Sequence, residues 1–142
     1  MKMDKQRYAH LLALADNAVD AVLAPSPENQ YQVDSQYNSH IAAFGVSVLM
    51  SGIKPTLAYF KGSTDETKTI LKLLGHMVIG EGFPEAGENY ATPEGLYAAA
   101  INMNAERMGK FKTLVLECAV ALKHVIRTYN LNLYEESTQT LL

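Results

Sequence analysis

The chain has 142 residues, of which 48% are hydrophobic and 19% charged, a balance typical of a packed globular protein. This length is enough for one hydrophobic core and short for two, so we expect a single domain over residues 1–142. Twelve basic and fifteen acidic residues give a net charge of −3. That charge excludes a global basic field for nucleic acid and leaves only a local basic patch for such binding.

Membrane insertion is not expected from this sequence. The N-terminal residues alternate between charged and apolar types, and the longest uncharged apolar stretch, residues 41–53, is shorter than the roughly 20 residues that cross a bilayer. We therefore expect a cytoplasmic protein with no membrane partner.

The first predicted helix runs from Asp4 to about Val22. Its apolar residues recur at the three- and four-residue spacing of a helix with one core-facing stripe. These residues are Tyr8, Leu11, Leu12, Ala15, Ala18, Val19 and Val22. Residues 24–33 contain two prolines and no periodicity, which predicts a connecting loop.

The second predicted helix begins near Asp34 or Ser35, both good N-cap residue types, and ends at Ser51-Gly52. Its main stripe consists of Tyr37, Ile41, Phe44 and Val48. Its other faces are also largely apolar, so we expect this helix either at the centre of the bundle or under a protein partner.

A short third helix is predicted from Lys54 to about Lys61, with Pro55 in its first turn. Ser63 and Glu66 have the spacing of a capping box that opens a fourth helix. The predicted core face of that helix consists of Ile70, Leu71, Leu74, Met77 and Val78.

Residues 80–91 contain three glycines, Pro84 and three glutamates, which predicts an acidic surface loop and the most mobile segment of the chain. Thr92-Pro93-Glu94 then has the composition of a helix start. Three apolar residues of this fifth helix should face inward, namely Leu96, Ala100 and Met103.

The sixth helix is predicted from about Lys110 to Tyr129, followed by a polar tail over residues 130–142. Its core stripe is the clearest in the chain and includes the single cysteine, Cys118, which we expect to be buried. The stripe consists of Phe111, Leu114, Val115, Cys118, Leu122, Val125, Ile126 and Tyr129. Because no strand alternation bounded by hairpin turns occurs, we predict an all-α fold, a compact bundle of about five to six helices.

Residues that could perform catalysis are sparse. The four histidines lack the spacing of a metal site, so we expect no catalytic residue, no metal ligand and no cofactor. Asp16 and Asp20 share one side of the first helix and form the basis of one alternative, a small metal-dependent enzyme. A solvated polar face explains the same two carboxylates.

The sixth helix carries a second stripe opposite its core face. Lys112, Lys123 and Arg127 lie on it, and Leu116 and Val120 lie between them. This stripe spans roughly 22 Å at about 1.5 Å per residue, enough to follow several phosphates or to bind a partner helix. The other interpretation is a solvated helix face with two incidental apolar residues.

Residues 37–60, with the sequence YNSHIAAFGVSVLMSGIKPTLAYF, carry a family signature. Their pattern resembles that of the small subunit of the type III-B CRISPR (Cmr) effector complex. The matching residues are Tyr37, Ser39, Gly52, Ile53, Thr56, Leu57, Ala58 and Phe60. Arg7 in the first helix and residues 116–129, LECAVALKHVIRTY, fit the same family more loosely.

The resemblance implies a non-catalytic helical subunit that stacks along the crRNA-carrying backbone and helps hold target RNA in antiviral defence. It implies other Cmr subunits, neighbouring copies of the chain and crRNA or target RNA as partners. We therefore expect RNA contact at Lys54, Lys112, Lys123 and Arg127, and a partner interface at Leu116 and Val120. The alternative is a helical adaptor in an unrelated assembly that contacts no RNA.

Overall fold

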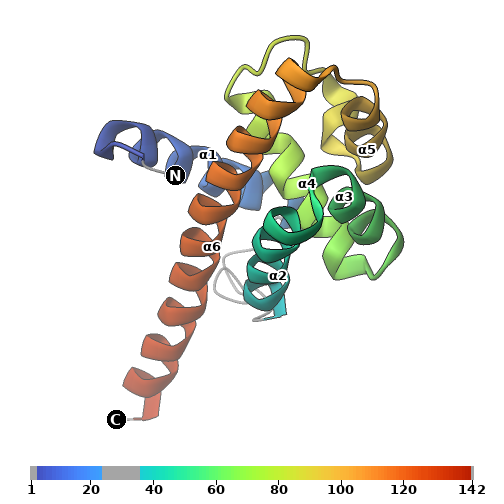
Figure 1. Ribbon diagram of the computed structural model, residues 1–142. Coiled ribbons are helices and arrows are strands. Elements are labelled where there is room, and N and C mark those ends of the chain that lie inside the picture. Colours follow the sequence, from blue (N-terminus) through green and yellow to red (C-terminus); the bar gives the residue numbers. More distant parts are fainter. Residues whose placement is uncertain (1–2, 24–35, 142) are drawn as a thin grey trace.

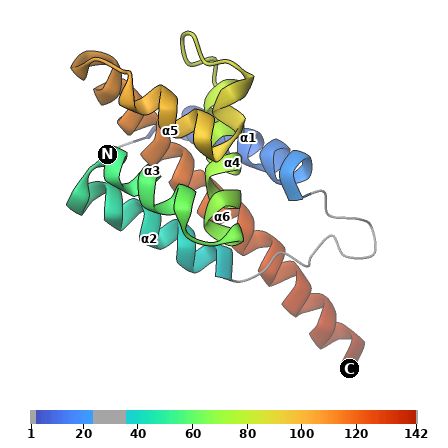
Figure 2. The same cartoon turned by 90° about the vertical axis from the view of Figure 1, so that its right-hand side faces the viewer.

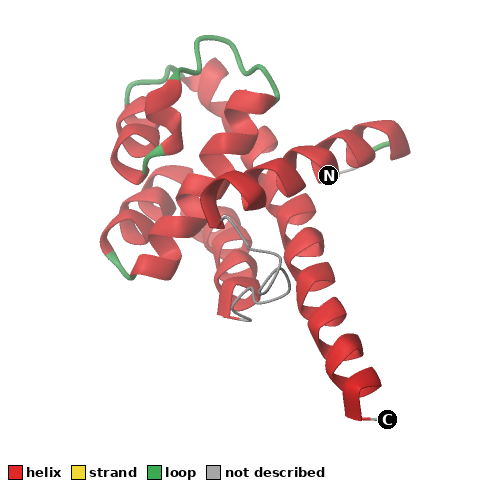
Figure 3. Cartoon of the chain, turned by 180° about the vertical axis from the view of Figure 1, so that it is seen from behind, coloured by secondary structure: helices red, strands yellow, loops and turns green. Residues whose placement is uncertain are grey.

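The computed structural model describes residues 3–23 and 36–141, and side-chain surroundings as far as Tyr129. These residues form helices and no strand, which confirms the all-α prediction (Figure 3). The elements are α1 (Lys5–Leu23), α2 (Gln36–Ser51), α3 (Ile53–Gly62), α4 (Asp65–Gly80), the 3-10 helix η1 (Glu88–Ala91), α5 (Pro93–Ile101) and α6 (Ala105–Leu141). The loop predicted over residues 24–33 and the N-cap at Asp34 or Ser35 lie outside the described residues.

The centre of the bundle is α4, which packs against every other helix (Figure 1). All five residues of its predicted core face are buried, and Leu73 and Gly75 are buried as well. The central position predicted as one alternative for α2 is therefore wrong. Only Ile41, Phe44 and Val48 of α2 are buried, and its opposite side faces solvent.

The starts of α4 and α5 follow the sequence closely, with one correction in the cap of α4. Thr92 caps α5 by accepting a hydrogen bond from the Gly95 N–H at 3.0 Å, as its position before Pro93 predicts. The capping box of α4, however, uses Thr64 and Thr67 and not Ser63 and Glu66. The buried Thr67 hydroxyl also donates to the carbonyl of Phe60, which joins α3 to α4 and favours this register.

The predicted end of α2 at Gly52 is confirmed. Gly52 has φ of 96°, a left-handed conformation that favours glycine, and it turns the chain directly into α3. The buried Thr56 hydroxyl donates to the Gly52 carbonyl at 2.8 Å and lies 2.6 Å from the Ser47 hydroxyl. These bonds hold the corner between α2 and α3.

The segment predicted as an acidic surface loop over residues 80–91 is partly structured and partly buried. It includes η1, and the side chains of Phe83 and Tyr90 are 9% and 5% exposed. Arg107 of α6 lies 4.5 Å over the Phe83 ring and donates hydrogen bonds to the Pro84 carbonyl and the Tyr90 hydroxyl. The loop is thereby attached to α6.

The last helix is longer than predicted in both directions. It begins at Ala105 and continues through the residues predicted as a tail, so that its C-terminal end projects beyond the other helices (Figures 1 and 2). Its predicted core stripe is buried from Phe111 to Ile126, and Tyr129 is half-buried. No described helix, α6 included, has the length and hydrophobicity required to cross a bilayer.

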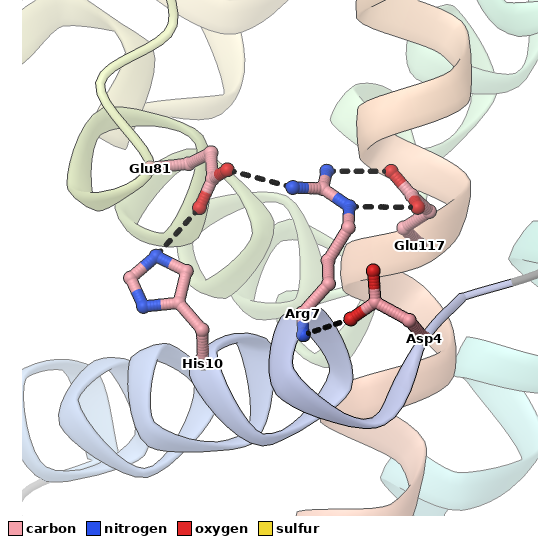
Figure 4. Close-up of polar contacts among 5 residues, drawn as sticks. All are labelled: Asp4, Arg7, His10, Glu81 and Glu117. Carbon is pink, nitrogen blue, oxygen red and sulfur yellow. Dashed lines mark hydrogen bonds and ion pairs between the residues drawn. The ribbon is translucent and has the colours of Figure 1, made fainter.

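A charged cluster fixes α6 against α1 and α4 (Figure 4). The Arg7 guanidinium donates two hydrogen bonds to the Glu117 carboxylate, at 3.0 and 2.7 Å, and a third to Glu81 at 2.9 Å. Glu117 is 6% exposed. The hydrogen bonds to Glu117 make the largest contribution to raising the pKa of Arg7 above its ordinary value, and the bond to Glu81 makes the next largest. The second Glu81 oxygen lies 2.8 Å from His10 Nε2, a contact that becomes a hydrogen bond when Nε2 carries the proton.

Replacing Arg7 should destabilise the fold because it leaves the buried Glu117 carboxylate without its partner. We expect Arg7→Met to lower the free energy of unfolding by roughly 2–5 kcal/mol, measured by urea denaturation. Lys5→Met, on the exposed side of the same helix, should change it little. The double variant Arg7→Met/Glu117→Met should lose less than the sum of the two single variants. Strict additivity would contradict this assignment of the pair.

Gly75 should tolerate no side chain, because a Cβ at this position would overlap the carbonyl oxygen of Tyr90 and force α4 away from η1. We expect Gly75→Ala to lower the free energy of unfolding by about 1–3 kcal/mol. The matched control is Gly109→Ala in α6, where a Cβ meets no atom within 4 Å. That change should stabilise the protein by roughly 0.5–1 kcal/mol, and equal losses in both variants would contradict the close approach at Gly75.

Candidate functional site

An apolar groove of about 390 Å³ lies between α2 and α6. Residues of α2 form one wall and residues of α6 the other. The groove, called here the α2–α6 groove, is lined by Ile41, Ala42, Gly45, Val46, Leu49, Leu116, Ala119, Val120 and Lys123. Lys123 is the one charged residue in this lining.

Large apolar side chains stand exposed along the α2 side of the groove. Val46, Leu49 and Met50 are 55%, 72% and 82% exposed, and their spacing places them on one stripe of the helix. Val120, across the groove, is 37% exposed. A contiguous patch of this kind, bordered by polar groups, is typical of an interaction surface. The largely apolar character of α2 on several faces was the sequence signal for it, although these three residues were not predicted as site residues.

The structure brings together some of the predicted site residues. Leu116, Val120 and Lys123 all line the α2–α6 groove. On the same face of α6, Lys112 lies about one turn before Leu116 and is half-buried, and Arg127 lies about one turn after Lys123 and is exposed. Lys54 is exposed on α3, which packs against α2, α4 and α5, so it belongs to a different part of the surface.

The basic character of the α6 face depends on Lys112, Lys123 and Arg127. Two other bases of the helix are already engaged, because Arg107 holds the loop of residues 80–91 and Lys110 lies 3.7 Å from Glu106. Within the part of the chain that the structure describes, no carboxylate forms an ion pair with Lys112, Lys123 or Arg127. The sequence of α2 contains no acidic residue. As far as the described side chains extend, this face therefore carries positive charge without a paired carboxylate, beside an apolar surface.

The carboxylates of α1 lie near the end of the described part of α6. Burial is the main cause that raises the pKa of Asp16, and the nearby charge of Asp20 raises it further. Burial is also the main cause that raises the pKa of Tyr129, with smaller contributions from the charges of Asp20 and Asp16. Over residues 3–23 and 36–129, no group of three or more histidine, cysteine or acidic side chains could hold a metal ion.

A second cleft, of about 660 Å³, lies beside the charged cluster. Its lining includes Arg7, Glu81 and Glu117, whose charged groups already bind one another, together with Glu106 and Lys110, which form their own pair. The charged groups that line this cleft are thus largely occupied by one another.

Cys118 is fully buried on the core side of α6, as predicted. Burial, with smaller contributions from the charges of Glu81 and Glu117, raises the pKa of its thiol to about 12. The thiol therefore stays protonated and unreactive at neutral pH.

The comparisons with known proteins give a family for the chain. Neither curated proteins nor solved structures include a significant match. The sequence matches the family described as CRISPR-associated protein (Cas_Cmr5) over residues 12–129. This range covers most of the chain and includes α2, α3 and the described part of the α6 face. The chain therefore belongs to the Cas_Cmr5 family of CRISPR-associated proteins, the Cmr subunit that the signature in residues 37–60 resembles.

Proposed function

We propose that the protein is a non-catalytic small subunit of a type III-B CRISPR effector complex. In this role it stacks along the crRNA-carrying backbone in the cytoplasm, beside other Cmr subunits and neighbouring copies of itself, and helps hold target RNA during antiviral defence. Family membership supports the place in a Cmr complex. Leu116, which is half-buried, and Val120, which is exposed, both line the α2–α6 groove and would contact a neighbouring subunit.

The RNA role rests on one observation, the line of cations on α6 that no described carboxylate pairs. Lys112, Lys123 and Arg127 share a face whose length is roughly 22 Å at about 1.5 Å per residue. Cations without an internal carboxylate partner are free to replace the counterions of a phosphate backbone, which gives affinity without reading base sequence. Lys54, near the start of α3 and apart from the α6 face, would supply a separate phosphate contact in this proposal.

A second candidate is a helical adaptor that holds two proteins together and contacts no RNA. The exposed apolar stripe of Val46, Leu49 and Met50 favours this role, because such a stripe fits a protein surface better than a phosphate backbone. Co-purification separates the two candidates. The proposed function requires crRNA and the backbone subunits in the purified assembly, whereas the adaptor does not.

Reversing the basic charges should weaken the hold on target RNA. In the reconstituted complex we expect Lys112→Glu, Lys123→Glu and Arg127→Glu each to lower the affinity for target RNA. We also expect each to reduce the slope of log affinity against log salt by roughly 0.7 for every phosphate that the variant no longer binds. Lys54→Glu should act in the same direction.

The matched control is Lys72→Glu on the exposed side of α4, away from these residues. It makes the same change in net charge and should leave the affinity and its salt dependence unchanged. Incorporation of every variant into the complex is measured in the same samples. Variants that are incorporated normally and retain target RNA as the unmodified complex does would rule out this surface.

A further inference from the structure

We propose that the α2–α6 groove binds an amphipathic helix of another protein subunit, which inserts a large aliphatic side chain over Gly45 and sets an Asp or Glu beside Lys123. This inference rests on the proposed role as a subunit of a larger complex. It assigns the groove to protein and replaces the phosphate contact proposed for Lys123 with a carboxylate contact, while Lys54, Lys112 and Arg127 remain the residues that would contact phosphate.

Small residues open the groove at its middle. Ala42, Gly45 and Ala119 contribute little or no side chain, and a Cβ built at Gly45 meets no atom within 4 Å. Glycine in the middle of a helix destabilises it by roughly 0.5–1 kcal/mol relative to alanine. Nothing inside the described chain requires glycine here, since Gly45 has a negative φ and open space above it. The open space is of the kind that a bulky side chain of a partner would fill.

The walls favour a helix as the occupant. The groove is bounded by two helices whose backbone N–H and C=O groups are bonded within each helix, so neither offers a partner to an extended strand. An extended peptide would bury unpaired backbone groups against Val46 and Leu49, which is costly. A helix satisfies its own backbone and presents side chains at three- and four-residue spacing to such a groove.

The charges define the partner's chemistry. Lys123 lines the groove without a carboxylate partner among the described residues, and α2 carries no acid. An acidic side chain one turn from the aliphatic anchor would pair with Lys123 while the lysine stem covers the apolar wall. RNA fits this groove poorly, because its phosphates would lose water against Val46, Leu49 and Val120 and would gain Lys123 as the one charged donor in the lining.

A second copy of the chain is a poorer match than a different subunit. Outside the groove lining, the described residues expose three large apolar side chains, Met50 on α2, Tyr59 on α3 and Ile101 on α5. Helices α3 and α5 each expose one such side chain, and α2, which exposes Val46, Leu49 and Met50 on one stripe, has no acidic residue to pair with Lys123. The described surface therefore does not supply the amphipathic helix that the groove would accept.

The occupant can be identified by crosslinking in the reconstituted Cmr complex. Because Cys118 is buried, Val46→Cys supplies a single reactive thiol at the rim of the groove, which is labelled with benzophenone maleimide and irradiated. We expect crosslinks to a helical segment of another protein subunit that has an Asp or Glu within one turn of an aliphatic residue. Ala13→Cys, exposed on α1, is the control and should not label that segment.

Filling the groove provides the second measurement. We expect Gly45→Leu to keep the thermal stability of the isolated chain and to reduce its incorporation into the complex by about tenfold, a loss typical of blocking a central anchor. Gly109→Leu is the matched control, because Gly109 also lies in a helix with no atom within 4 Å of a Cβ, and it should be incorporated normally.

The outcomes separate this inference from the proposed function. Failure of the unmodified chain to join the complex would overturn both. Normal incorporation of Gly45→Leu, or crosslinks from Val46→Cys to RNA, to a second copy or to no chain at all, would overturn the assignment of the groove alone. Loss of RNA affinity in Lys54→Glu, Lys112→Glu or Arg127→Glu bears only on the RNA contacts, whereas a Lys123→Glu variant that is incorporated normally would overturn the proposed pairing of Lys123 with the partner.

Discussion

The structure depends on the pairing of Arg7 with Glu117. A carboxylate that is almost fully buried needs a partner that binds both of its oxygens, and the Arg7 guanidinium does so with two short hydrogen bonds. Through its third bond, to Glu81, the same side chain ties the end of α4 into the contact (Figure 4). One cation therefore fixes α6 relative to α1 and α4, and the α6 wall of the groove is held in place through Glu117, which directly follows the groove residue Leu116.

The central position of α4 explains why α2 can serve as an interaction surface. Because α4 packs against all the other helices, the core is complete with a single stripe of α2 turned inward. The remaining apolar residues of α2 are not needed for folding, and Val46, Leu49 and Met50 stay at the surface. Exposed residues of this type cost solubility, so their place beside a basic helix face is most simply explained by a partner that covers them.

Local patterns in the sequence predicted local structure well, and contacts between distant segments poorly. The stripes of α4 and α6, the Thr92 cap and the turn at Gly52 all depend on neighbouring residues, and all are confirmed. The capping box was wrong by one position because the Thr67 hydroxyl also bonds Phe60, a contact that a spacing rule does not include. The buried aromatics of residues 80–91 were missed because Arg107 and the close approach of Gly75 hold them from outside the loop.

The candidate site was likewise predictable only where it depends on one helix. The helical period of α6 predicts that Leu116, Val120 and Lys123 share a face, whereas the opposite wall depends on how α2 packs across it. The apolar composition of α2 indicated that it would be covered on several sides, but composition does not distinguish a central helix from an interface helix. Pairing of Arg7 with Glu117 left no signal in the sequence, because residues so far apart share no spacing rule.

That separation has a consequence for synthesis of the protein. Arg7 leaves the ribosome before its partner Glu117, which follows 110 positions later. At about 5–20 residues per second, roughly 6–22 s pass before the two can meet. Throughout this interval α1 has no α6 to pack on, so the nascent chain carries an exposed apolar face and relies on late closure, or on a chaperone, to avoid aggregation.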